Sequence, residues 1–263
     1  MTLTSAERLL QELGITEPQE IDLEAIAYHV GARIRYRSLD GCEARIVGYG
    51  DTAIIAVSAK SPLRRARFSI SHELGHWEHH RGQKLACRVE DYHPRDKASP
   101  ERLADAYAAD LLMPHYLFQP LAREQGKLTF KAVNALADTF NTSLTATAIR
   151  LVESDHSPAL LIRHGMRGRR WFTRAPSLAE HWFPKSELDT ASSAFELVYG
   201  TRQDDPLPRK VRADAWFDCR EARGYDIHEQ TMRVGDDEVL TLLLLSDPRM
   251  LQDRDNPSRG RFR

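Results

Sequence analysis

The segment "RFSISHELGHWEHH", residues 67–80, places His72, Glu73 and His76 in the spacing HExxH. Histidines four residues apart lie on the same face of an α-helix, one turn from each other. Apolar residues recur at helical spacing through the same segment, which predicts a helix with one buried face. The segment therefore indicates a helix that presents two imidazole rings to one point.

Two imidazoles so placed can bind one tetrahedral Zn²⁺ at about 2.0–2.1 Å. We predict His72 and His76 as metal ligands. Glu73, the next residue along the helix, can act as the general base toward the water that zinc activates, as this spacing does in metalloproteases. Zn²⁺ is the chemically expected ion, although Mn²⁺ can also occupy a site of two histidines and one glutamate.

A catalytic zinc also needs a third protein ligand and one open position. No further ligand motif follows His76, so the third ligand should be a carboxylate from a second helix. The segment "SPERLADAYAADLLMP", residues 99–114, predicts such a helix, in which Glu101 and Asp105 share a face. We predict Glu101 as the metal ligand and Asp105 as the acceptor for the free ring N–H of a zinc-bound histidine. The alternative for Glu101 is a first-turn glutamate that stabilises the helix dipole.

The predicted peptidase domain covers residues 1–120, and the chain before the motif supplies further helices and its sheet. Capped amphipathic segments predict helices over residues 4–13 and 22–30. Short alternating or β-branched runs predict a small antiparallel sheet of three strands, over residues 32–38, 43–50 and 52–59. The predicted fold class is thus α+β, with a zincin-like domain made of a small antiparallel sheet and the HExxH helix.

Residues 121–156 predict a helix-turn-helix-like segment, with helices over 130–139 and 143–153. Arg150 is the only basic residue expected to point outward from the second helix. DNA reading by this segment is therefore possible but not favoured, and a packing role for the helices is the preferred interpretation.

Residues 157–263 predict a third domain, of α+β type and built on an antiparallel sheet. The predicted strands are residues 159–165, 169–176, 207–218 and 238–247, with a helix over 186–200. The last residues, 253–263, are predicted to be a disordered basic tail.

The composition restricts the class of protein. The chain has 263 residues and a net charge of −1, which gives it no general attraction to nucleic acid or anionic membranes. Its three cysteines are widely spaced and suggest no disulfide framework. The N-terminus lacks the pattern of a signal peptide, and no apolar run is long enough to span a membrane, so we expect a cytoplasmic protein.

With these residues in view, the sequence resembles the ImmA/IrrE family of metallo-endopeptidases. "RFSISHELGHW" is similar to the family's HExxH helix, and "ERLADAYAADLLMP" is similar to its E-x-x-A-N-x-F-A-x-x-L-L-M-P helix. The resemblance implies the same metal ligands, His72, His76 and Glu101, and the same catalytic glutamate, Glu73. The family's usual asparagine is Asp105 here, a departure that keeps a hydrogen-bond acceptor.

The order of the domains looks like the IrrE branch, in which the third domain is similar to GAF sensor domains. The resemblance implies a protease that cleaves a helix-turn-helix transcriptional repressor and so derepresses stress or DNA-damage-response genes. Two alternatives from other classes stay open. One is a DNA-binding transcription regulator with a structural zinc, and the other is an immunity or antitoxin protein that binds its partner without proteolysis.

Overall fold

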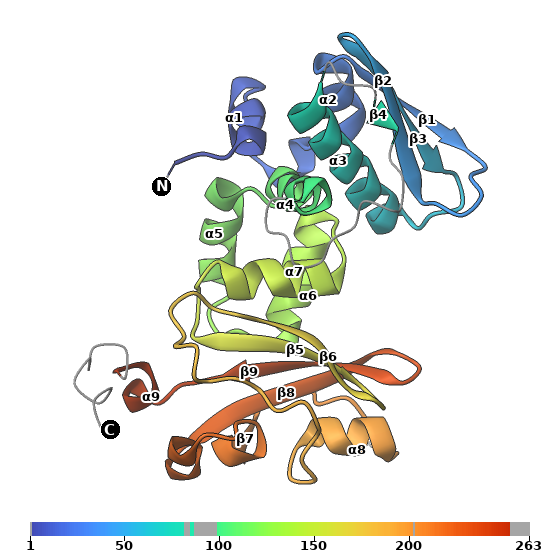
Figure 1. Ribbon diagram of the computed structural model, residues 1–263. Coiled ribbons are helices and arrows are strands. Elements are labelled where there is room, and N and C mark those ends of the chain that lie inside the picture. The colour runs from blue at the N-terminus through green and yellow to red at the C-terminus, as the bar shows by residue number, and fades with distance from the viewer. Residues whose placement is uncertain (1, 82–84, 87–98, 202, 253–263) are drawn as a thin grey trace, which may run out of the picture. The chain divides into compact units, whose positions relative to one another are not determined.

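The computed structural model describes residues 2–81, 85–86, 99–201 and 203–252 (Figure 1). The chain forms two compact units. The first comprises Met1–Leu121 with Ala135–Thr147, and the second comprises Ala122–Asn134 with Ala148–Arg263. The mixed α+β class predicted from the sequence is confirmed. The predicted tail, residues 253–263, lies outside the described residues, and the predicted domain boundaries stay predictions.

The sheet of the first unit has four strands in the order β1-β3-β2-β4. Their bounds are β1 Ala32–Arg37, β2 Ala44–Tyr49, β3 Thr52–Ser58 and β4 Leu85–Ala86. β2 and β3 form the predicted antiparallel hairpin. The prediction of an antiparallel sheet was wrong for β1, which pairs parallel with β3. The short strand β4, which pairs with β2, was not among the three predicted strands.

One face of this sheet is covered by α3 (Leu63–His80), the helix that carries the HExxH residues (Figure 1). Trp77 of α3 is 1% exposed, and its indole N–H donates to the carbonyl of Val30 at 2.8 Å. A Cβ at Gly48 of β2 would lie 2.6 Å from Cζ3 of Trp77, so only glycine allows this approach. Trp77 therefore seals α3 against the sheet, as its spacing predicted.

Two other helices of the first unit, α2 (Leu23–His29) and α4 (Pro100–Leu112), contact α3. The helix α1 (Ser5–Glu12) packs on α4. The N-caps of these helices are Thr4, Asp22 and Ser99, and each accepts a hydrogen bond from the first turn of its helix. A further helix, α5 (His115–Glu124), was not predicted, and Pro120 within it weakens the helical signal of this segment.

The predicted helix pair is present as α6 (Phe130–Phe140) and α7 (Leu144–Glu153). Between the helices, the hydroxyl groups of Thr142 and Thr147 hydrogen-bond at 2.7 Å. The expectation for Arg150 was wrong, because its side chain is 7% exposed and does not point outward. The α7 helix consequently offers no exposed basic side chain for DNA reading.

The second unit is built on an antiparallel sheet of five strands in the order β6-β5-β9-β8-β7, which confirms the predicted antiparallel arrangement. The strand bounds are β5 Ala159–Gly165, β6 Gly168–Arg174, β7 Arg209–Arg212, β8 Asp226–Gly235 and β9 Glu238–Leu244. β8 was not predicted. The strand expected over 207–218 ends at Arg212, because the 3₁₀ helix η3 (Ala213–Ala215) follows immediately.

The helix α8 (Ser193–Tyr199) packs on β8 and β9 and is shorter than the predicted 186–200. Beneath it, the buried carboxylate of Glu229 accepts hydrogen bonds from Ser193, Thr231 and the indole of Trp216. The last described element is the helix α9 (Pro248–Gln252). The similarity of this unit to GAF domains stays a prediction.

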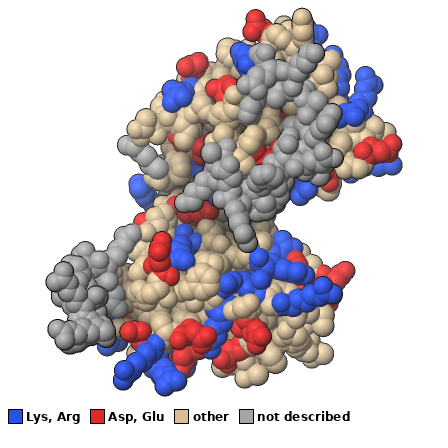
Figure 2. Space-filling view, viewed as in Figure 1, with Lys and Arg blue, Asp and Glu red and all other residues tan. Residues whose placement is uncertain are grey.

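Basic and acidic side chains are interleaved over the molecular face in Figure 2, with a group of basic side chains on the β5–β6 part of the second unit. This mixture agrees with the net charge of −1. None of the described helices combines the length and apolar character that crossing a membrane requires.

Candidate metal centre

The candidate site lies where α3 packs against α4. A Cβ on Gly75 would lie 2.8 Å from Cα of Ala104 and 3.0 Å from its carbonyl oxygen. Real Cβ atoms essentially never approach this closely, so the two helix backbones meet at a distance that only glycine permits. This contact occurs between His72 and His76 on α3, and one turn after Glu101 on α4. The close approach thus brings the side chains of the two helices within reach of one another.

Three of these side chains converge on one point. Nε2 of His72 lies 3.1 Å from Nε2 of His76 and 3.1 Å from Oε2 of Glu101. Nε2 of His76 lies 3.4 Å from Oε1 of Glu101. Within the described residues, these three form the group of histidine, cysteine or acidic side chains that could hold a metal ion.

Asp105 determines which nitrogen of His72 carries the proton. Its Oδ1 lies 2.9 Å from Nδ1 of His72, and a carboxylate oxygen accepts a hydrogen bond from an N–H. In the neutral ring, Nδ1 is then protonated and Nε2 carries a lone pair. That lone pair faces the carboxylate of Glu101 and the ring nitrogen of His76. Such a cluster of acceptors is electrostatically unfavourable unless a cation or a proton lies among them.

The electric field of the site favours positive charge. Burial lowers the pKa of His72, but the hydrogen bond and charge of Asp105 and the charges of Glu73 and Glu101 raise it more, so the net shift is upward. The same negative charges would attract a divalent cation. Because a metal ligand must be the neutral imidazole, protons and a cation compete for His72.

Glu73 and His76 are the buried members of the site, 5% and 3% exposed. The side chains of His72 and Glu101 are 18% and 21% exposed, so this side of the group faces solvent. Glu73 lies close enough to raise the pKa of His72 by its charge. A buried carboxylate beside a partly solvent-exposed ligand group can accept a proton from a water molecule bound there.

The spacing of the ligand atoms fits a single small cation. Atoms bound at about 2.0–2.1 Å around a tetrahedral Zn²⁺ are separated from one another by about 3.3–3.4 Å. The observed separations of 3.1, 3.1 and 3.4 Å agree with that arrangement. The set of two imidazole nitrogens and one carboxylate also leaves room for a fourth ligand, as catalytic zinc sites do.

The structure thus brings together the residues that the sequence selected, His72, His76 and Glu101, with Asp105 behind His72. Gly75 was not singled out from the sequence. A glycine inside a predicted helix with no cap nearby is a signal of close backbone approach, and it could have indicated the contact with the second helix.

Neighbouring residues have packing roles. Tyr107 is 5% exposed, and its ring meets that of His79, so this side chain has a packing role. His79 is exposed, and the backbone N–H of His115 donates to the buried Glu7 of α1 at 2.7 Å.

Comparisons with known proteins agree with this geometry. Residues 27–152 match the model of an "IrrE N-terminal-like domain", the peptidase M78 family. A solved structure of a Mycobacterium tuberculosis transcriptional regulator has the same fold, with a TM-score of 0.59 at 15% identity. The match covers 91% of this chain and 75% of that one. No curated protein matches the sequence.

Proposed function

We propose that the chain, whose residues 27–152 match the IrrE N-terminal-like domain, is a zinc-dependent endopeptidase whose substrate is a helix-turn-helix transcriptional repressor. The convergence of His72, His76 and Glu101 within hydrogen-bonding distance carries this proposal. Cleavage of the repressor would derepress stress or DNA-damage-response genes, as the family resemblance implies.

In this proposal His72, His76 and Glu101 hold the ion, and Asp105 keeps His72 in the tautomer that presents Nε2. A bound Zn²⁺ lowers the pKa of water to about 7 and polarises a substrate carbonyl. Glu73 accepts the proton from the attacking water and can later deliver it to the leaving amine. The burial of Glu73 keeps its carboxylate in a defined position while the opposite side of the group stays open to solvent.

Two observations favour this proposal over a DNA-binding regulator with a structural zinc. Structural zinc usually has four protein ligands, whereas the group here offers three from the described residues. The single basic residue of α7, Arg150, is buried and therefore does not reach DNA from the helix surface. A gel-shift titration against salt would separate the two functions, because a DNA reader loses affinity steeply as salt rises.

The exchange Glu73→Gln tests the chemistry. It keeps the shape of the side chain but removes the proton acceptor, so repressor cleavage should fall by about a hundredfold or more. Metal content should remain, because Glu73 is not a proposed ligand. Glu12→Gln on the exposed end of α1 is the matched control and should leave both unchanged.

Co-expression with neighbouring repressor genes, followed by mass spectrometry of the fragments, provides the measurement. Retained cleavage in Glu73→Gln would contradict the role of this residue. A retained cellular effect without any cleavage, in the wild type and in the variant, would instead favour the immunity or antitoxin protein that binds without proteolysis.

The third predicted domain, residues 157–263, is proposed to sense a signal or to restrain the protease. Deletion after residue 157 tests this, with and without stress, by the extent of repressor cleavage. The deletion also removes Gln230, whose side-chain oxygen accepts from the backbone N–H of Phe130 at 2.9 Å. Circular dichroism should therefore first show that the truncated chain keeps the helix content expected of residues 1–157. Unchanged regulation in such a folded fragment would refute the sensor role.

A further inference from the structure

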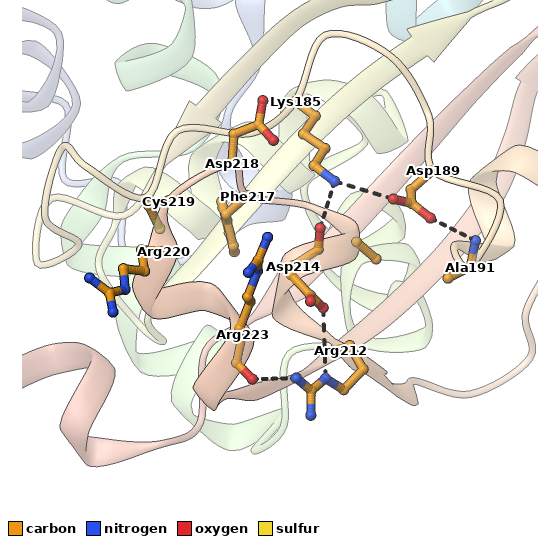
Figure 3. Close-up of a pocket in the computed structure, with 11 residues that line it drawn as sticks. Lys185, Asp189, Ala191, Arg212, Asp214, Phe217, Asp218, Cys219, Arg220 and Arg223 are labelled. Carbon is orange, nitrogen blue, oxygen red and sulfur yellow. Dashed lines mark hydrogen bonds and ion pairs between the residues drawn. The ribbon is translucent and has the colours of Figure 1, made fainter.

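The second unit contains a cavity of about 640 Å³ that the proposed peptidase chemistry does not use (Figure 3). This volume lies within the roughly 300–1,000 Å³ typical of small-molecule sites. Its wall combines the loop before α8, the segment from the end of β7 through η3, and the 3₁₀ helix η4 (Arg220–Gly224). A neighbouring cavity of about 410 Å³ shares Lys185, Asp189 and Asp218 with it, so the hollow continues along the surface.

Two ion pairs neutralise most of the acidic groups in this wall. The ammonium group of Lys185 donates to Oδ2 of Asp189 at 3.2 Å and to the backbone carbonyl of Asp214 at 2.6 Å. The guanidinium group of Arg212 lies 3.7 Å from Oδ1 of Asp214 and also donates to the carbonyl of Arg223. An ammonium group has three N–H donors, so Lys185 is held in place with one donor left over.

Two further guanidinium groups in the wall are not neutralised. Among the residues that the structure describes, the side chains of Arg220 and Arg223 make no hydrogen bond or ion pair. They are three residues apart in η4, and both side chains are exposed. In Figure 3 the guanidinium group of Arg223 lies beside Phe217, in the middle of the labelled residues, and Arg220 lies nearer their edge.

The arginines around β6, in contrast, have partners within the second unit. Arg163 and Arg170 both pair with the carboxylate of Glu238. Arg169 and Arg174 lie over the ring of Phe172. The basic side chains there are engaged within the unit. The two arginines of η4 line the cavity, and Asp218 is the acidic lining residue for which the described residues provide no hydrogen bond or ion pair.

We propose that this cavity binds a small phosphate-bearing molecule, with Arg223 and Arg220 contacting the phosphate and Lys185 donating a further hydrogen bond. A guanidinium fork matches the oxygens of phosphate in geometry and remains charged at every physiological pH. Two such groups suit the double charge of a phosphate monoester better than the single charge of a carboxylate. Ala191 and the buried side chains of Ala215 and Phe217 also line the cavity, beside which the organic part of the ligand would lie.

The full-length chain can be titrated with ribose 5-phosphate, adenosine monophosphate and inorganic phosphate by calorimetry, with ribose and acetate as comparisons. We expect saturable binding of the phosphate compounds, weakening as salt rises, and no binding of ribose. A tighter fit of the two esters would identify the ligand as an organic phosphate. Equal affinity for inorganic phosphate would identify the free ion.

Arg223→Gln should weaken binding of ribose 5-phosphate about ten- to hundredfold, the usual effect of losing a hydrogen bond to a charged group. Arg220→Gln should act in the same direction. Arg123→Gln, an equal charge change on the exposed end of α5, is the matched control and should leave binding unchanged.

Absence of saturable binding at millimolar concentrations of all three phosphate compounds would overturn the proposal. So would equal losses in Arg223→Gln and Arg123→Gln, because the effect would then come from net charge and not from the cavity. Circular dichroism of each variant establishes that the fold is retained.

Discussion

Replacing Gly75 by alanine should push α3 and α4 apart at the candidate metal centre. The added Cβ would lie 2.8 Å from Cα of Ala104, 3.0 Å from its oxygen and 3.1 Å from Cβ of Tyr107. Carbon atoms pack favourably at about 3.5–4.0 Å, so the helices must separate by roughly 0.5 Å or more. Two of the three obstructing atoms belong to the backbone and cannot rotate away.

The cost of this change divides into two opposing terms. Overpacking of a tight core contact costs about 1–3 kcal/mol. Alanine gains about 0.8–1.0 kcal/mol over glycine in a helix interior. The free energy of unfolding should therefore fall by up to about 2 kcal/mol, which is a modest loss for a folded domain.

Metal affinity should suffer more than stability. Metal–ligand distances are held within about 0.2 Å of their preferred values, and the shift of Glu101 away from His72 and His76 exceeds that tolerance. We expect the affinity for Zn²⁺ to fall at least about tenfold, measured by competition with a chromophoric chelator. Thermal unfolding followed by circular dichroism gives the stability.

Two further variants sharpen the test. Gly235→Ala adds a Cβ that meets nothing within 4 Å and should change neither quantity. Adding Ala104→Gly to Gly75→Ala should not restore affinity, because the clash involves the backbone of Ala104 and not its side chain. Wild-type affinity in Gly75→Ala would refute the claim that this backbone contact positions the ligands.

Asp105→Ala should weaken Zn²⁺ binding about 10- to 100-fold, because Nδ1 of His72 loses its acceptor. Asp105→Asn should retain most of the affinity, since the amide oxygen still accepts. Equal losses of affinity in the two variants, measured by the same chelator competition, would count against an orienting role for Asp105. A pH effect is expected at His164, where burial lowers the pKa to about 4, with the Lys185 carbonyl opposing this shift and the charge of Arg169 adding to it. The unfolded chain takes up the proton near pH 6.5, so this histidine's contribution to stability is present above that pH and is lost as the pH falls toward 4. Between pH 7 and pH 4.5, the free energy of unfolding in urea should fall by about 2–3 kcal/mol less for His164→Leu than for the wild type. An identical fall in both proteins would show that His164 does not titrate in this way.

Local patterns were enough to predict most helices. Thr4, Asp22 and Ser99 mark helix starts because a capping side chain satisfies backbone N–H groups within its own first turn. The pair α6 and α7 was predicted for a similar reason, since each helix repeats its apolar residues at helical spacing. The elements that were missed or mistaken depend on partners far away in the chain. β1 runs parallel to β3 through pairing that no turn dictates, and the apolar alternation is the same for either direction.

What the sequence determined by itself is the identity of the site: a four-residue spacing puts His72 and His76 on one face, and the same spacing puts Glu101 and Asp105 on another helix. Local helical geometry suffices for each pair. Only the tertiary structure decided that the two faces meet, through the glycine contact at Gly75, and that Arg150 is buried. It alone assembled the cavity around Arg223 from two separated segments, residues 185–191 and 212–223. Distances between helices follow from how closely their backbones can pack, and that depends on both partners at once.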